Sequence, residues 1–407
     1  MDLEKIKQKI RPDEVVILKR VDSFLKKINE EIKKRKIKAT AVVGGSIAKG
    51  TFIKGDYDID IFVKFSKEYP NEKLSDILEK CIKKLKPERL HGSRDYFQIK
   101  KKELIFEVIP VYDIKSSNEA VNITDASTLH FKWVKEQIKR NPELKDEIRL
   151  ARAFCKANGL YGAESYIRGF SGHVIDILTI YYGGFINLLK KASKWKEKEV
   201  IDFYNVYKGE ALKKLNISKI QSPLIIIDPV QPERNAAASL SREIFYKFIE
   251  KANEFIKRPS EKFFEKKKFS LPSIKKKKAI IIKVNPLKGK KDVIGSKLLK
   301  AFEKIKKQLE INGFEIKDCG WHWEEEAYYW FVLKNKKISK TYVKEGPPLK
   351  SKNNVENFKK KHKKTFVEGK RIYAYAEREF NTAEKLLNWV LKKEDIKKCF
   401  RTARIIN

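Results

Sequence analysis

The sequence is short of acidic residues relative to basic ones. Its 407 residues include 54 Asp and Glu against 92 Lys and Arg, a formal net charge of +38. An excess of this size indicates a polyanionic partner, either a nucleic acid or an anionic membrane. No apolar run approaches the roughly 18 residues that a membrane span needs. The charged N-terminus also lacks the apolar core of a secretory signal, so we favour a nucleic acid and expect no membrane.

Cysteine and histidine are also scarce. The four cysteines are scattered, with no metal-ligand spacing, and are expected to be buried thiols of a cytoplasmic protein. Five histidines argue against a histidine-rich metal site. Hydrophobic residues nevertheless make up 42% of the chain and aromatic residues 11%. This content excludes wholesale disorder, and the length predicts roughly two to four domains.

Helices and strands alternate through residues 1–127. Apolar residues at helical spacing predict one or two helices over 4–35 and another over 73–85. Short apolar or alternating stretches predict strands at 39–43, 58–63, 96–100 and 104–110. This region is therefore expected to form a first domain around a mixed sheet.

Helical patterns dominate residues 128–256, which we expect to form a separate helical domain. The clearest helical stretches are 144–157, 172–189 and 239–256. A basic segment follows: residues 257–291 contain fourteen Lys or Arg and two acids. This composition indicates a linker and a basic surface.

The C-terminal part shows the element order βαββαβ. The predicted strands and helices are, in chain order, 279–284, 295–311, 314–319, 327–333, 354–364 and 371–376. This order is that of the ferredoxin-like fold, which often binds RNA. We therefore expect a basic ferredoxin-like body over residues 257–378. A last helix at 382–391 and a basic end predict a short helical tail, 379–407.

Residues suited to phosphate chemistry begin directly after the first predicted strand. Gly44 and Gly45 allow the backbone to approach a ligand closely. Ser46 offers a hydroxyl and an amide at the start of a predicted helix, where N–H groups favour phosphate. Lys49 adds positive charge nearby.

Three carboxylates are the candidate metal ligands. Asp58 and Asp60 are two apart on a predicted strand and so share one face. Glu107 lies among apolar residues on a later strand, where a charge is costly unless it coordinates a ligand. Mg²⁺ typically binds one or two carboxylates together with substrate phosphates. Asp56 is expected to lie in the preceding loop, outside the site, because Gly55 precedes it. A phosphate site beside such carboxylates predicts nucleotidyl transfer with two metal ions.

Several sequence runs resemble a known family. The run 44–51 with Asp58 and Asp60 resembles the polymerase-β nucleotidyltransferase superfamily. The runs 156–164, 168–172, 228–230 and 234–238 narrow the resemblance to the archaeal, class I CCA-adding enzymes. The similarity covers nearly the whole chain. It implies an α+β protein with a polymerase-β-like head (1–127), a helical neck (128–256), the ferredoxin-like body and the tail.

The resemblance also implies an activity and a set of site residues. Such enzymes add C, C and A to the 3′ end of tRNA from CTP and ATP, without a nucleic-acid template. Asp58, Asp60 and Glu107 match the metal carboxylates, and Mg²⁺ is the expected ion. The positions that match nucleotide-binding residues are Ser46, Lys49, His130, Arg152, Tyr161 and, less closely, Arg234. The expected partner is tRNA, contacted at its acceptor stem and T arm, and a homodimer is a further expectation.

Two departures from the family pattern leave alternatives open. The third carboxylate is usually Asp, whereas Glu107 has one more methylene. The C-terminal tail is also short. One alternative is another nucleotidyltransferase of the superfamily, such as a poly(A) polymerase, which would use ATP alone. The other is a catalytically silent RNA-binding protein that keeps the fold.

Overall fold

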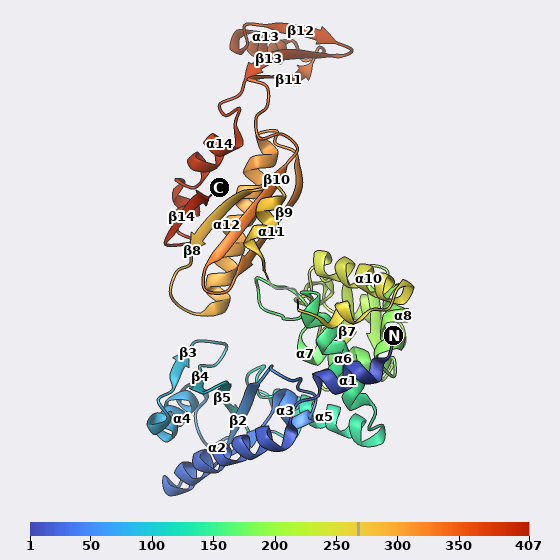
Figure 1. Cartoon of the computed structure of the whole chain (residues 1–407), viewed down its shortest axis with the longest axis vertical. Helices are drawn as coiled ribbons and strands as arrows, with labels where there is room; N and C mark the ends of the chain where they lie inside the picture. Colours follow the sequence, from blue (N-terminus) through green and yellow to red (C-terminus); the bar gives the residue numbers. More distant parts are fainter. Residues whose placement is uncertain (267–268, 407) are drawn as a thin grey trace. The chain divides into compact units, whose positions relative to one another are not determined.

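The computed structural model describes residues 1–266 and 269–406. Its contacts divide the chain into two compact units, unit 1 (1–267) and unit 2 (268–407); Figure 1 colours them along the chain. Unit 1 contains both the first α/β region and the helical region. The division lies near the expected start of the basic body, whereas the boundary expected after residue 127 stays a prediction.

A five-stranded mixed sheet forms the first half of unit 1. Its strands, in sheet order, are β1 (Ala39–Val43), β2 (Asp58–Phe65), β5 (Leu104–Tyr112), β4 (Tyr96–Lys101) and β3 (Glu88–Leu90). β2 and β5 are parallel, and the other neighbours are antiparallel. Polar and apolar residues alternate along β2 and β5, so one face of each is buried. The mixed sheet that the sequence predicts is confirmed.

Four helices belong to this part of the chain, and the first of them packs on the helical half of unit 1 and not on the sheet. They are α1 (Leu3–Ile10), α2 (Glu14–Lys34), α3 (Gly45–Lys49) and α4 (Leu74–Ile82), with 3₁₀ turns at Asn71–Lys73, Lys83–Leu85 and Ser117–Glu119. Asp13 caps α2 by accepting a hydrogen bond from the Val16 amide. The buried residues of α2 recur every three or four positions and pack on the sheet. α3 follows β1 directly and places the candidate phosphate-binding residues at the sheet edge.

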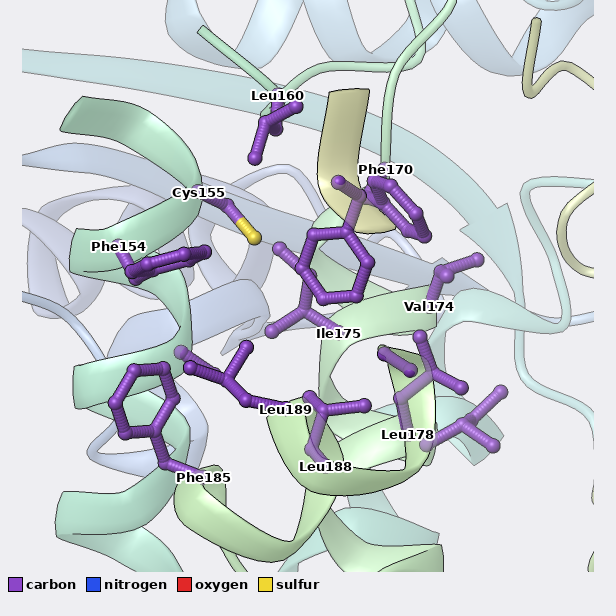
Figure 2. Close-up of a cluster of buried hydrophobic side chains, with 14 of the residues drawn as sticks. Phe154, Cys155, Leu160, Phe170, Val174, Ile175, Leu178, Phe185, Leu188 and Leu189 are labelled. Carbon is purple, nitrogen blue, oxygen red and sulfur yellow. The ribbon is translucent and has the colours of Figure 1, made fainter. Parts of the chain in front are cut away.

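The second half of unit 1 is mainly helical. Its helices are α5 (Ser127–Arg140), α6 (Leu144–Ala157), α7 (Gly172–Tyr181), α8 (Phe185–Ala192), α9 (Ala211–Lys214) and α10 (Arg242–Lys257). A two-stranded parallel sheet of β6 (Glu199–Asp202) and β7 (Leu224–Ile227) and 3₁₀ turns at Ile217–Ile220 and Glu261–Phe264 complete it. Figure 2 shows side chains from α6, α7 and α8 meeting in one buried cluster, among them Phe154, Ile175 and Leu189.

The single helical stretch expected at 172–189 is two helices. Gly183 and Gly184 adopt φ values of +70° and +137°, which other residues rarely adopt, and the chain turns there. Among the described residues, no single helix has the length and apolar content of a membrane span. α7 and α8 together reach that content but meet at 93°.

Unit 2 contains a ferredoxin-like domain, built from the first four elements that the sequence predicts but with a different last helix and strand. Its sheet order is β14 (Thr402–Ile406), β8 (Ile280–Asn285), β10 (Ala327–Leu333) and β9 (Ile316–Trp323). The helices that share its core are α12 (Lys291–Ile311) and α14 (Ala383–Val390). Short helices α11 (Leu271–Lys276) and α15 (Glu394–Lys397) precede β8 and β14. The last helix and strand of the fold therefore come from the segment expected to be a helical tail.

The segment between β10 and α14 forms a second, three-stranded sheet. Its order is β11 (Thr341–Pro348), β13 (Arg371–Glu377) and β12 (Thr365–Glu368), with α13 (Lys352–Lys361). The helix and strand expected at 354–364 and 371–376 exist, but they belong to this sheet. The prediction failed because local patterns do not show which strand pairs with β8, and β14 takes that place.

Candidate active site

A tight turn between β1 and α3 brings the glycine pair against β2. The Gly44 amide donates a hydrogen bond of 2.8 Å to the Asp60 carbonyl. Gly45 has φ +53°, and a Cβ there would lie 1.8 Å from the Asp60 Oδ2. A Cβ on Gly44 would lie 2.2 Å from the Phe62 ring. Both glycines are therefore required for Ser46 to lie beside the carboxylates.

The parallel pairing of β2 and β5 brings the three candidate carboxylates together. Asp60 is in register with Glu107, and Asp58 lies two residues earlier on the same face of β2. Burial raises the pKa of Asp60 to about 6; the nearby Lys49 opposes this increase, and the charge of Asp58 adds to it. Burial, followed by Asp60 and Asp58, raises the pKa of Glu107 to about 7. The carboxylates thus resist ionising side by side, and a cation between them would relieve this repulsion.

Buried ion pairs with Asp176 hold the two basic residues of the site, Lys49 and Arg152. The Lys49 Nζ lies 2.5 Å from Asp176 Oδ2, and Arg152 Nη2 lies 2.7 Å from Asp176 Oδ1. All three side chains are almost fully buried. Burial lowers the pKa of Lys49 although Asp176 opposes the shift. Despite its burial, the pKa of Asp176 is lowered by Arg152 and Lys49.

These residues line one cavity of about 270 Å³. Its lining residues are Gly45, Ser46, Lys49, Asp56, Asp58, Asp60, Arg152, Lys156, Tyr161, Gly172 and His173. Lys156 pairs with Asp56, and its Nζ lies 4.3 Å from the centre of the Tyr161 ring. Burial raises the pKa of Tyr161 to about 12, so the phenol stays protonated at neutral pH. The cavity joins acidic, basic and aromatic side chains, as a nucleotide with its metal ions requires.

A second polar cluster surrounds Asp228, which follows β7. Its Oδ2 lies 3.1 Å from His130 Nε2, 3.5 Å from His173 Nε2 and 3.1 Å from Arg234 Nη1. The two imidazole rings lie 4.2 Å apart between centroids. Burial, with His130 adding, lowers the pKa of His173 to about 4 although Asp228 opposes the shift. Because His173 also lines the cavity, the cluster is continuous with it.

The residues predicted from the sequence thus gather from distant segments of unit 1. Ser46, Lys49, Asp58, Asp60, Arg152 and Tyr161 line the cavity itself. Glu107 lies beside the cavity because it is in register with Asp60. His130 and Arg234 lie near it because both contact Asp228.

Sequence reasoning missed several residues of this site. It does not point to Asp176 or His173, and it gives Lys156 and Asp228 no role although both lie in runs that resemble the family. Asp56 does lie in a loop, as expected, but it lines the cavity. For Asp176 one signal was available, since a lone acid in the apolar helix α7 needs a buried cationic partner.

Comparison with solved structures defines the class of protein. A structure of the Cid1 poly(U) polymerase matches 65% of this chain and 97% of its own, with a TM-score of 0.52 at 12% identity. A cytoplasmic RNA terminal U-transferase matches 65% of this chain and 98% of its own, with a TM-score of 0.51 at 11% sequence identity. At such identities the likeness concerns the fold. A family model described as a nucleotidyltransferase domain also matches residues 25–125. The chain is therefore a nucleotidyltransferase with a polymerase-β-like fold.

Two further models and several relatives identify the family. The models are described as tRNA nucleotidyltransferase, second domain (residues 146–265) and CCA-adding enzyme, C-terminal domain (275–399). The CCA-adding enzyme of Nanoarchaeum equitans is 37% identical over 83% of this chain and 84% of its own. That of Methanocaldococcus jannaschii is 31% identical, covering 90% and 88%. The chain belongs to the CCA-adding enzyme family and is a tRNA nucleotidyltransferase that uses nucleoside triphosphates.

Proposed function

We propose that the cavity of unit 1 is the site of the family's reaction, the addition of C, C and A to the 3′ end of tRNA from CTP and ATP. The observation that carries this assignment is that Asp58 and Asp60 line one cavity with Ser46, while Glu107 lies in register beside Asp60 on the neighbouring strand. In each addition the terminal 3′-hydroxyl oxygen bonds to the α-phosphorus. The bond from that phosphorus to the bridging oxygen breaks, and pyrophosphate leaves.

The donor set fits divalent cations, and we propose Mg²⁺. Asp58 and Asp60 would hold the ions, and Glu107 would complete the set. The raised pKa values of Asp60 and Glu107 support this role, because buried carboxylates that also repel one another are stabilised by a bound cation. Hard carboxylate oxygens are the ligands that Mg²⁺ prefers. When bound, two such ions neutralise charge on the attacking and leaving oxygens.

The triphosphate is assigned to the Ser46 turn and the basic side of the cavity. Ser46 offers its hydroxyl and amide next to Asp60. Lys49 and Arg152 share the single carboxylate of Asp176, which leaves a net positive charge there. We expect this excess to attract the phosphates while Asp176 keeps both cations in place.

The sugar and base are assigned to Tyr161, His130 and Arg234. Tyr161 presents a protonated phenol to the cavity beside Arg152. Asp228 orients both His130 and Arg234, so the two donors face the same region. Arg234 is paired with Asp228 and one-third exposed, so part of its guanidinium is available to a base. Its planar donor set suits the different polar edges of cytosine and adenine.

We assign tRNA binding chiefly to the basic surface of unit 2. Three successive lysines end α13, and four more occupy positions 275–278. Lysines on such surfaces contact phosphates without reading sequence, which suits the double-stranded acceptor stem and T arm. A cytoplasmic location and a homodimer stay predictions, which cell fractionation and light scattering would test.

A primer-extension assay tests the proposal. A tRNA lacking its last three nucleotides is incubated with the protein and Mg²⁺, with CTP, ATP or both. We expect two additions with CTP alone and a third only when ATP is present. Long tails from ATP alone would support a poly(A) polymerase. The absence of extension would support a silent RNA-binding protein.

A further inference from the structure

Two histidines and one aspartate converge at the edge of the cavity from three separate elements. His130 lies on α5, His173 in the first turn of α7, and Asp228 follows β7. One ligand atom from each lies within 4.8 Å of the other two. Asp228 is fully buried, while the imidazoles are 12% and 18% exposed. Among the described residues, no other trio of His, Cys, Asp or Glu was found with this spacing.

The atoms are close, but the two histidine nitrogens make no well-directed hydrogen bond. His130 Nε2 and His173 Nε2 lie 3.1 and 3.5 Å from Asp228 Oδ2. Both nitrogens are buried and have no hydrogen-bond partner of good geometry. Leaving such nitrogens unsatisfied is unfavourable. Ligands of one metal ion show this arrangement, since their lone pairs point to a shared centre and not at each other.

The carboxylate is held as a metal ligand would be. Asp228 Oδ1 accepts hydrogen bonds from the amides of Val230 (2.9 Å) and Gln231 (3.3 Å). These bonds leave Oδ2 facing the imidazoles. Arg234 Nη1 also lies 3.1 Å from Oδ2, and an oxygen with two lone pairs can serve a guanidinium and a metal ion together. Such bonds to ligating groups are typical of metal sites.

We propose that His130, His173 and Asp228 form a binding site for a transition-metal ion of the Zn²⁺ type, distinct from the Mg²⁺ site of the carboxylates. For a tetrahedral ion with bonds of about 2.0–2.1 Å, neighbouring ligand atoms are about 3.3 Å apart, and the two N–O distances bracket that value. Imidazole selects Zn²⁺ and Co²⁺ over Mg²⁺, whereas the three carboxylates have the opposite preference. Because His173 lines the cavity, a fourth ligand can come from there.

The proposal has a consequence for the nucleotide. Because His130 and Arg234 are assigned to the sugar and base, an ion held by His130 would compete with that contact. We therefore expect Zn²⁺ to raise the apparent KM for nucleotides at saturating Mg²⁺. This consequence rests on the proposed function, whereas the metal site itself does not.

Co²⁺ absorption spectroscopy tests the site directly. Chelator-treated full-length protein is titrated with Co²⁺ in the presence of excess Mg²⁺. We expect one Co²⁺ per chain with the intense visible absorption of a tetrahedral ion, and Zn²⁺ should displace it. Weak octahedral absorption alone, or no saturable uptake, would overturn the proposal and leave Asp228 as a hydrogen-bonding hub.

Matched variants separate this site from the carboxylates. His173→Phe keeps an aromatic ring and should weaken Co²⁺ binding about 100-fold or more, because it removes a ligand. His322→Phe, in unit 2, is the control and should bind Co²⁺ normally. The triple variant Asp58→Asn, Asp60→Asn, Glu107→Gln should keep the Co²⁺ spectrum while losing extension. Loss of the spectrum in the triple variant with retention in His173→Phe would contradict the site. Circular dichroism melts establish that each variant is folded.

Discussion

Two lysine–aspartate ion pairs, one in each unit, differ in how deeply they are buried. In unit 1 the Lys49–Asp176 ion pair beside the cavity is buried: Lys49 is 8% exposed and Asp176 is fully buried. In unit 2 the pair Lys304–Asp395 is 35% and 57% exposed. A buried pair is hardly screened by salt, and removing one partner leaves an uncompensated charge. An exposed pair contributes little and weakens with salt. Substitutions should therefore have large, specific effects in unit 1 and small, salt-dependent effects in unit 2.

The largest effect is expected from the carboxylates. Asp60→Asn should lower the rate of nucleotide addition about 1,000-fold or more, because metal ions supply several kcal/mol of transition-state stabilisation. Asp58→Ala should lower the rate to a similar extent. Both variants should bind tRNA almost as tightly as the wild type does. Single-turnover extension and a filter-binding assay measure the two quantities. Full activity in either variant would remove the carboxylates from the mechanism.

A matched pair of substitutions tests the buried against the exposed ion pair. Asp176→Asn keeps the side-chain size but leaves Lys49 and Arg152 without a buried counter-charge, so it should cost about 3 kcal/mol of unfolding free energy. It should also raise the KM for nucleotides. Asp395→Asn, which breaks the exposed pair with Lys304, should cost within about 0.5 kcal/mol. Urea unfolding measures both. Equal losses would mean that burial does not distinguish the two units.

The sequence predicted the catalytic edge of unit 1 better than its surroundings, for a physical reason. Gly45 and Ser46 begin the short helix α3, and Asp58 and Asp60 lie close by in sequence on the next strand, so local rules place them together. Asp176 pairs with Lys49 from a helix more than a hundred residues later. Neither periodicity nor spacing encodes such a tertiary pairing, and no local motif marks it.

Unit 2 shows the corresponding limit for the fold. The βαββαβ order is present twice: once ending in β13, as predicted, and once ending in β14, as the sheet is built. Local patterns cannot choose between two candidate edge strands, because the choice depends on which one meets β8 in space. The pairing of Ile405 with Ile282, beside the core that α14 completes, decides it.

The pH dependence of cation binding tests whether the carboxylates repel one another. Burial raises the pKa of Asp60 to about 6 and of Glu107 to about 7, so cations must displace protons below these values. Cation affinity should therefore increase as the pH rises from about 5 to 8, by up to about tenfold per pH unit for each proton displaced. Isothermal titration with Mn²⁺ across this range measures the change.

The folding stability of the cation-free protein should change with pH in the opposite direction to cation affinity. Because the folded state binds more protons than the unfolded state between the ordinary and the raised pKa values, cation-free protein should lose stability as the pH rises from about 4 to 7. Glu107→Gln should reduce that loss and raise the melting temperature at pH 8. A melting temperature independent of pH in wild type and variant alike would show that burial and mutual repulsion do not raise these two pKa values.

The smallest effect is expected from the lysines at the end of α13. Lys359, Lys360 and Lys361 are exposed, and replacing all three with Gln should weaken tRNA binding roughly tenfold at moderate salt. The plot of log affinity against log salt should become less steep by about one for each phosphate that the variant no longer binds. The control replaces Lys33, Lys34 and Lys36 at the exposed end of α2 in unit 1. An equal loss of affinity in both triple variants would mean that net charge attracts tRNA without a defined surface, because the two remove the same charge from different units.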